Sequence, residues 1–226
     1  MAETSDSSRS SGRLRDFLPY LVIAVVVVGG VFFWAVHPDG GGLVTYKWMA
    51  NQNAVHSQLR LYVFPQTGFS LRNFSAVPGN SSPELGNNAY ADNYRNLYYG
   101  RTEQGDPLRL ISKDVADAFL VDNPLGGAPT PSEAPGTAEP YNGYYFQEDV
   151  SGAVPASAYK TKYAFMAFPA VYGETGYKVF WTDQEGVVFS HDPKLPTGTP
   201  AAEIARLFLP ATPPGGNPSI RWRRER

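Results

Sequence analysis

The sequence predicts an α+β protein with one N-terminal transmembrane helix, followed by a domain in which a helix packs on a small antiparallel β-sheet. Three observations predict this class. Residues 17–36 are apolar and carry no charge, and residues 43–63 have an amphipathic helical pattern. The C-terminal third contains short aromatic-rich segments separated by turn-forming residues. Such segments, bounded by Gly and Pro, are typical of strands.

Composition excludes several classes of protein. The 226 residues carry a formal net charge of −2, whereas a nucleic-acid-binding protein normally has a clustered basic excess. The absence of cysteine excludes disulfides, thiol catalysis and cysteine-ligated zinc, and three histidines are too few for a histidine-rich metal centre. No nucleophile, metal or phosphate-loop motif is present, so we expect no catalysis and no cofactor.

The apolar run at residues 17–36 predicts a membrane anchor. A helix of this length rises about 30 Å, the thickness of a bilayer core. Tyr20 and Trp34 lie near its ends, as in an aromatic belt. A cleaved signal peptide is the alternative, but the run is longer than a signal-peptide core, and Ala35-Val36-His37 is a poor cleavage site.

The residues that flank this run predict its orientation. Arg9, Arg13 and Arg15 precede it, and the first basic residue after it is Lys47. The positive-inside rule therefore predicts a single-pass protein with a cytoplasmic N-terminus. The C-terminal domain would be extracytoplasmic, either periplasmic or at the cell surface. The lipid bilayer is then one predicted partner.

The rest of the chain divides into segments of different character. Residues 1–16 are predicted to be a disordered cytoplasmic tail, residues 17–36 the transmembrane helix and residues 37–42 a flexible joint. An extracytoplasmic α+β domain follows at 43–220, with a Pro-rich loop or linker at 122–140 and a basic tail at 221–226.

The predicted domain begins with a helix at residues 43–63. Trp48, Val55, Leu59 and Tyr62 share one face of that helix, and Gln52 lies near them. Residues 65–92 are rich in turn-forming residues and predict an irregular loop, and residues 93–110 predict two short strands around a turn.

Further elements follow from the remaining patterns. Ser112 is expected to cap a short helix whose buried stripe is formed by Val115, Phe119 and Leu120. Strands are predicted at residues 142–147 and 160–169, and a hairpin at 178–182 and 187–190 with a left-handed Gly186. The two faces of the 160–169 strand are both apolar, which indicates either cover on both sides or one face that meets a partner. A last helix at 200–208 is predicted to have Thr199 as its cap and Ile204, Leu207 and Phe208 as its apolar face.

Several residues are candidates for contact with partners. Gly29 and Gly30 could allow close packing of the membrane helix with a neighbour, but a tolerated glycine pair facing lipid is the preferred interpretation. The basic tail, with Trp222 and Arg223, suits an anionic surface, or it is an exposed solubilising tail. A tyrosine-rich group could form a carbohydrate- or protein-facing surface, or serve the core of a sheet; its members are Tyr90, Tyr94, Tyr98, Tyr99, Tyr141, Tyr144 and Tyr145.

Other polar residues have simpler interpretations. His191 and Asp192 are adjacent and therefore point to opposite sides of a strand, which does not suit an acid–base pair. His56 is read as a surface or packing residue. Asp114, Asp117 and Asp122 do not have the spacing of a twelve-residue calcium loop. We therefore predict no metal site and no catalytic residue.

Residues 94–192, somewhat under half of the chain, resemble pilin-like bacterial envelope proteins. The resemblance is carried by Gly143-Tyr144-Tyr145-Phe146, by the apolar strand at 164–169, by Thr175-Gly176, and by the hairpin from Phe180 through Gly186 to Val188. The segment LYYGRTEQGDPLRLISKDVADAF is similar to the middle region of such proteins. A similar ending occurs in an uncharacterised family of secreted bacterial proteins, so the motif marks a fold more than an activity.

The resemblance implies a membrane-anchored helix, an antiparallel sheet packed on it, and a structural or secretion-associated role. The chain departs from true pilins and pseudopilins at the processing site, where residues 16–21 lack the family's Gly and Glu, and at the glycines of 40–42. We expect a structural or accessory subunit of a bacterial envelope assembly, associated with other membrane proteins or with copies of itself. The alternative is a membrane-tethered binding module that recognises a glycan or envelope polymer through the tyrosine-rich surface.

Overall fold

The computed structural model describes residues 23–33, 43–81, 83–120, 138–148, 159–208 and 221–225. The chain forms two compact units, Met1–Lys47 and Trp48–Arg226. In the first unit, residues 23–33 are helical. None of the helices within the described residues is long and apolar enough to cross a membrane. Residues 17–22 and 34–36 of the predicted anchor lie outside the described residues, so the anchor stays a prediction.

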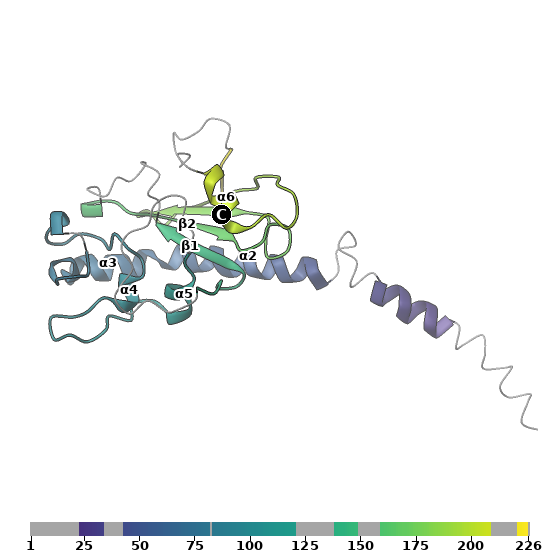
Figure 1. Cartoon of the computed structure of the whole chain (residues 1–226), viewed down its shortest axis with the longest axis horizontal. Helices are drawn as coiled ribbons and strands as arrows, with labels where there is room; N and C mark the ends of the chain where they lie inside the picture. The colour runs from purple at the N-terminus through teal and green to yellow at the C-terminus, as the bar shows by residue number, and fades with distance from the viewer. Residues whose placement is uncertain are drawn as a thin grey trace, which may run out of the picture. The chain divides into compact units, whose positions relative to one another are not determined.

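The second unit is an α+β fold, as predicted, built on a five-stranded antiparallel sheet with the strand order β1-β2-β3-β4-β5 (Figure 1). The strands are β1 (Tyr144–Glu148), β2 (Ala164–Pro169), β3 (Val179–Asp183), β4 (Val188–His191) and β5 (Arg223–Arg224). The helices are α2 (Leu43–Leu61), which crosses the boundary between the units, α3 (Val63–Leu71), α4 (Asn96–Tyr99), α5 (Lys113–Asp117) and α6 (Ala201–Leu207). Two short 3-10 turns are η2 (Phe74–Ala76) and η3 (Pro83–Leu85).

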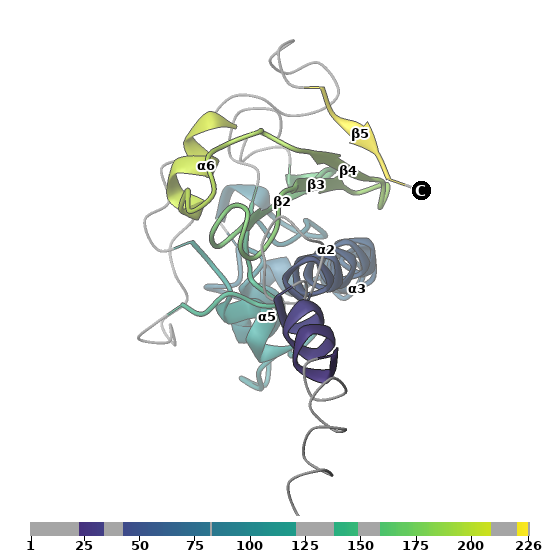
Figure 2. The same ribbon diagram turned by 90° about the vertical axis from the view of Figure 1, so that its right-hand side faces the viewer.

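Both faces of the sheet are covered by helices at strand β2. The apolar residues on the two sides of β2 therefore reflect cover on both sides and not a face left for a partner. Residues alternate between faces along a strand. Phe165 faces the C-terminal end of α2, where its ring centroid lies 4.9 Å from that of Tyr62, the residue that follows this helix. Phe168 faces α6, where its ring centroid lies 6.1 Å from that of Phe208. Figure 2 shows α2 and α6 on opposite sides of the strands. All six residues of β2 are consequently buried.

The amphipathic face of α2 is confirmed. Val55, Leu59 and Tyr62 are each at most 1% exposed, and Gln52 is buried beside them as its position predicts. Trp48 is half-buried and packs its ring edge-on against Tyr177 at 5.0 Å. This face therefore forms the contact between the helix and the sheet.

The predicted loop at residues 65–92 is wrong at its start, because α3 continues to Leu71. Pro65 stands in the first turn of α3, where a missing N–H leaves no helical hydrogen bond unmade. A proline ring also clashes with the carbonyl four residues earlier, here that of Leu61, where α2 ends. The proline therefore divides one long helix into two segments and does not stop it.

The two strands predicted at residues 93–110 are also wrong. Asn93 Oδ1 accepts a hydrogen bond from the backbone N–H of Arg95 at 3.0 Å, and the turn continues into α4. Asn favours such starts because its side chain satisfies a free backbone N–H. Only the single bridge Arg101↔Pro107 has strand-like pairing in this segment.

The C-terminal elements match the predictions more closely. The hairpin is β3–β4, with Gly186 at φ 69 in the left-handed region. β1 starts at Tyr144 and not at residue 142, because Asn142 and Gly143 form a left-handed turn. The cap by Ser112 is confirmed, since its Oγ accepts from Val115 N at 3.3 Å. Val115 is buried, but Phe119 and Leu120 follow the helix and are only half-buried.

Two details of α6 differ from the prediction. The residue before the helix is Pro200, and the Thr199 hydroxyl donates to Pro196 O at 2.7 Å, so it does not cap the helix. Ile204 and Phe208 are buried as expected, but Leu207 is 49% exposed.

Candidate functional site

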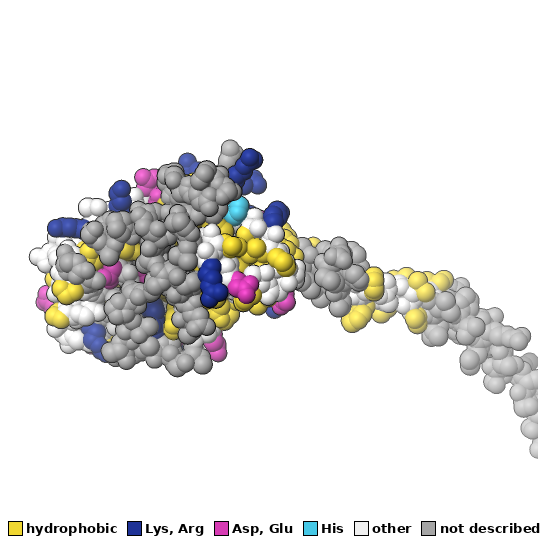
Figure 3. Space-filling view, turned by 45° about the horizontal axis from the view of Figure 1, so that its top comes forward, with side chains coloured by type: hydrophobic (Ala, Val, Ile, Leu, Met, Phe, Trp, Pro, Cys, Tyr) yellow, Lys and Arg dark blue, Asp and Glu magenta, His cyan; other side chains and the backbone are white. Residues whose placement is uncertain are grey.

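Gly29 and Gly30 lie within the helix at residues 23–33. A Cβ added at either position would have no atom within 4 Å. The apolar side chains around them are exposed, from 57% for Val27 to 68% for Val28 and Phe32 (Figure 3). Neither glycine is therefore needed for packing against the described part of this chain.

The predicted tyrosine contacts come from two elements and differ in burial. Tyr98 and Tyr99 belong to α4, are half-buried, and pack edge to face at 4.9 Å. Tyr145 on β1 is half-buried, whereas Tyr144 on the same strand is fully buried. The Tyr144 hydroxyl donates to Lys178 O at 3.0 Å, and its ring packs against Gly176 so closely that a Cβ there would clash. The prediction of Tyr144 as a partner contact is wrong, because it faces α2 inside the core.

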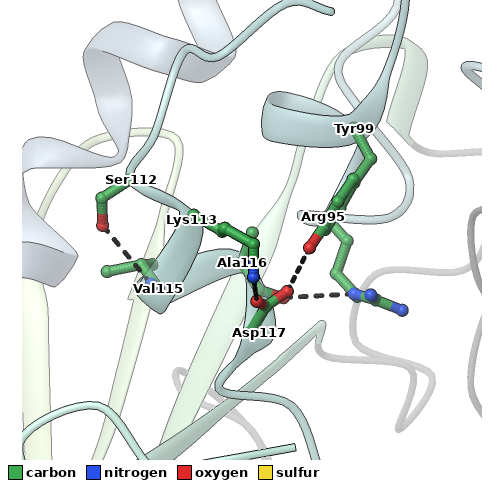
Figure 4. A network of polar contacts seen from close by, with 7 residues as sticks. All are labelled: Arg95, Tyr99, Ser112, Lys113, Val115, Ala116 and Asp117. Carbon is green, nitrogen blue, oxygen red and sulfur yellow. Dashed lines mark hydrogen bonds and ion pairs between the residues drawn. The ribbon is translucent and has the colours of Figure 1, made fainter. Parts of the chain in front are cut away.

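A polar network joins α4 to α5 (Figure 4). Asp117, at the end of α5, accepts hydrogen bonds from the Tyr99 hydroxyl and from Lys113 Nζ. Partial burial, together with the hydrogen bond to Asp117, raises the pKa of Tyr99 above its usual value. The network exists because Ser112 caps α5 and so places Lys113 and Asp117 one turn apart on the same side.

Arg95 lies under this network and is only 2% exposed. Its Nε donates to Ala116 O at 3.1 Å, and its guanidinium lies 4.3 Å from the ring centroid of Phe119 and 5.2 Å from that of Tyr99. Its two terminal nitrogens are buried and have no hydrogen-bond partner among the described residues. The contacts with two aromatic rings offset part of the cost of burying this charge.

Glu148, at the end of β1, is another buried ionisable residue of this region. Its Oε1 accepts from Tyr94 N at 2.5 Å. Burial raises the pKa of Glu148 to about 7, although the hydrogen bonds from backbone N–H groups and the nearby Arg95 act in the opposite direction. Sequence reasoning missed both groups. The alternation of β1 contains the signal for Glu148, because it lies two residues after Phe146 and so faces the same side.

An open cleft of about 550 Å³ borders the network. Most of its lining residues are polar, and three of them, Asp114, Asp117 and Glu139, are carboxylates. The other lining residues are Lys113, Pro140, Tyr141 and Asn142. Carboxylates beside a tyrosine can hydrogen-bond hydroxyl or amino groups of a ligand. No group of three metal-ligating side chains occurs within the described residues, and Asp122 lies outside them.

The predicted basic tail is in part the edge strand β5. Trp222 packs its ring 5.6 Å from Phe208 and 6.0 Å from His191, and is half-buried. Glu225 accepts from Lys178 Nζ at 2.7 Å and from the Ser190 hydroxyl. Arg223 is exposed on the strand. The tail is therefore not separate from the fold at residues 222–225, because an aromatic anchor and an ion pair attach it to β4.

A second cleft, of about 600 Å³, lies where β5 approaches α2. It is lined by Arg60, Glu185, Gly186, Val187, Val188, Arg224 and Glu225. Burial acts to raise the pKa of Glu225, but the hydrogen bonds from Lys178 and Ser190 outweigh it and place that pKa below its usual value. This cleft therefore combines basic and acidic groups.

The histidines His56 and His191 contact neighbouring residues of the fold. His191 Nδ1 lies 3.1 Å from Arg221 O, while Asp192 accepts from the Tyr172 hydroxyl and from Lys194. The two adjacent side chains thus have different partners. His56 is half-buried on α2, with its ring 6.5 Å from that of Phe180, and burial lowers its pKa.

A family described as a protein of unknown function (DUF2950) matches residues 116–212. The matched segment contains β1 to β4 and α6, and it does not reach α2, α3, α4 or β5. No curated protein matches the chain. No solved structure matches it either.

Proposed function

We propose that the protein is a membrane-anchored structural or accessory subunit of a bacterial envelope assembly and performs no catalysis. The observation that carries the proposal is the helix at residues 23–33, whose large apolar side chains are all more than half exposed. Exposure of so much contiguous apolar surface to water is unfavourable, so a bilayer or other proteins must cover it. The uncharged sequence from 17 to 36 is long enough for a bilayer.

The second unit gives independent support. A long amphipathic helix, α2, packs one face on an antiparallel sheet, which is the arrangement that the resemblance to pilin-like proteins implies. The buried polar residues of this unit, such as Arg95 and Asp117, bond to neighbouring elements and serve to hold the fold together. A scaffold of this kind suits a subunit that presents surfaces to partners.

Membrane fractionation of the full chain tests the anchor. We expect the protein to stay in the membrane pellet after an alkaline carbonate wash. Val26→Asp with Val27→Asp should release it, because an Asp at the centre of a membrane helix costs about 3 kcal/mol. Val26→Leu with Val27→Leu is the matched control and should stay in the pellet. Release of the unaltered chain would contradict the anchor.

The association of the anchored chain with partners has its own test. Gly29→Leu with Gly30→Leu adds bulk where nothing in the described chain is contacted, so the fold should be preserved. We expect these changes to remove the proteins that co-purify after cross-linking, since small residues permit close helix packing. Val28→Leu is the control. Retention of every partner by the glycine double variant would speak against a helix-mediated assembly.

One observation favours a second candidate, a membrane-tethered module that binds a glycan or envelope polymer. The cleft of about 550 Å³ places Tyr141 beside Asp114 and Glu139, groups that suit sugar hydroxyls. This candidate predicts that the chain co-sediments with purified cell-wall material and that Asp114→Asn with Glu139→Gln weakens the binding. If no co-sedimentation occurs at low salt, this candidate is excluded.

A further inference from the structure

The helix α3 is apolar on two opposite sides. Its inner side carries the fully buried Phe69, which packs 6.1 Å from Phe74. Its outer side carries Phe64 and Leu71, which are 73% and 79% exposed, and Leu61 just before the helix is 53% exposed. Large apolar side chains that are exposed together on one side of a helix usually mark a surface that contacts another protein or a membrane. The outer side of α3 therefore requires a cover.

The three exposed side chains form one surface. Leu61, Phe64 and Leu71 are separated by three and by seven residues, which places them on the same side of a helix. Gly68 lies between Phe64 and Leu71 on this side, and a Cβ at that position would meet no atom within 4 Å. We call these three residues the α3 outer face.

Only positive charge flanks the α3 outer face along the chain. Arg60 and Arg72 are exposed on either side of it, and no Asp or Glu occurs between Gly40 and Pro83. Across the fold, Glu185 and Glu225 line a cleft together with Arg60. Glu225 is already bonded to Lys178, and Arg224 lines the same cleft.

We propose that the α3 outer face lies on the surface of an anionic lipid bilayer. Its Leu and Phe side chains enter the boundary between headgroups and acyl chains, and Arg60 and Arg72 contact lipid phosphates. The inference rests on the proposed membrane anchor, which keeps the domain close to a bilayer. A second copy packed on the same face would bring like charges together without an acidic residue of that face to offset them, so we favour the lipid surface.

The absence of cysteine permits a site-specific test in the full chain. Phe64→Cys places a single thiol for an environment-sensitive fluorophore on the α3 outer face. Leu207→Cys is the matched control, because Leu207 is an exposed leucine on α6, on the opposite side of the sheet (Figure 2). Each labelled chain is reconstituted into vesicles of phosphatidylcholine alone or of phosphatidylcholine mixed with phosphatidylglycerol.

We expect the label at position 64 to shift its emission to the blue and to lose quenching by aqueous iodide in the anionic vesicles. The label at position 207 should stay quenched in both. Arg60→Glu with Arg72→Glu, in the Phe64→Cys background, should restore the quenching. Arg206→Glu on α6 is the charge control and should leave the protection unchanged.

Three results would overturn the inference. They are equal quenching at positions 64 and 207, equal protection in neutral and anionic vesicles, and a Phe64→Cys disulfide dimer that forms in both detergent and vesicles. A labelled chain that floats with vesicles but stays quenched contradicts this inference alone. A chain that does not float with vesicles contradicts the proposed anchor as well.

Discussion

The side-chain amides of two buried residues, Gln66 and Asn80, bind the backbone of the irregular segment that follows α3. Gln66 on α3 donates from Nε2 to Ala91 O at 3.1 Å and accepts at Oε1 from Ala91 N at 2.9 Å. Asn80 likewise donates to Phe74 O at 3.1 Å and to Arg101 O at 2.7 Å. Because an unpaired buried polar group is costly, these amides hold an irregular segment in one arrangement. Composition alone predicts only that the segment is a loop.

The buried Glu148 predicts a pH dependence of stability. Burial raises its pKa in the folded chain from 4.5 to about 7, so the folded state holds a proton that the unfolded state has lost in this window. Stability therefore falls as the pH rises from about 4.5 to about 7, by on the order of 3 kcal/mol. We expect Glu148→Gln to remove this fall, as measured by urea unfolding in detergent micelles at pH 5 and pH 8.

Glu174→Gln is the matched control for that measurement, because Glu174 is exposed. The control should keep the pH dependence of the unaltered chain. If Glu148→Gln shows the same loss of stability between pH 5 and pH 8 as the unaltered chain, the carboxyl of Glu148 is not the group responsible.

At the scale of elements, β5 shows how a charged tail becomes part of a sheet. Its two residues pair with Phe189 and Ser190 of β4. Trp222 and Glu225, on either side of it, make the contacts that hold it in place. Two strand residues alone would pair weakly, since the stability of a sheet depends on side-chain contacts across its strands.

This arrangement predicts that Trp222→Ala loosens the edge of the sheet. The change removes the ring contacts with His191 and Phe208. It should lower the free energy of unfolding by about 1–3 kcal/mol, the usual range for a partly buried large side chain. We expect faster amide hydrogen exchange along β4, measured by mass spectrometry.

Arg224→Ala serves as the control for the edge strand, because Arg224 is exposed and belongs to the same strand. Its effect on stability should be within about 0.5 kcal/mol. Equal effects of Trp222→Ala and Arg224→Ala would mean that the aromatic contacts do not attach β5.

At the scale of the whole molecule, the two units differ in where their apolar side chains lie. The helix at residues 23–33 exposes its apolar side chains, whereas the second unit encloses a continuous aromatic core on both faces of its sheet. A chain that combines these properties is expected to be anchored by the first unit and folded through the second.

The proposed anchor predicts the N-terminus of the protein in membranes. Residues 16–21 lack the glycine and glutamate of a prepilin processing site, so we expect no cleavage between Asp16 and Phe17. Mass spectrometry of the protein extracted from membranes measures this directly. A start at Phe17 would instead indicate prepilin-type processing and would make a filament subunit the leading proposal.

Local sequence patterns were enough to predict several features of the fold. The alternation of β2, the left-handed Gly186 of the hairpin, the Ser112 cap and the inward face of α2 follow from spacing and residue type. Each of these results from a conformational preference that acts over a few residues.

Other features depend on contacts between residues that lie far apart in the chain. Tyr144 is a core residue and not a contact surface because Gly176 leaves room for its ring. The basic tail became a strand because β4 offered a free edge and Lys178 a partner for Glu225. The burial of Arg95 and Glu148 depends on segments far apart in the chain. Such contacts gain their free energy from burial and pairing across the fold, which no local pattern records.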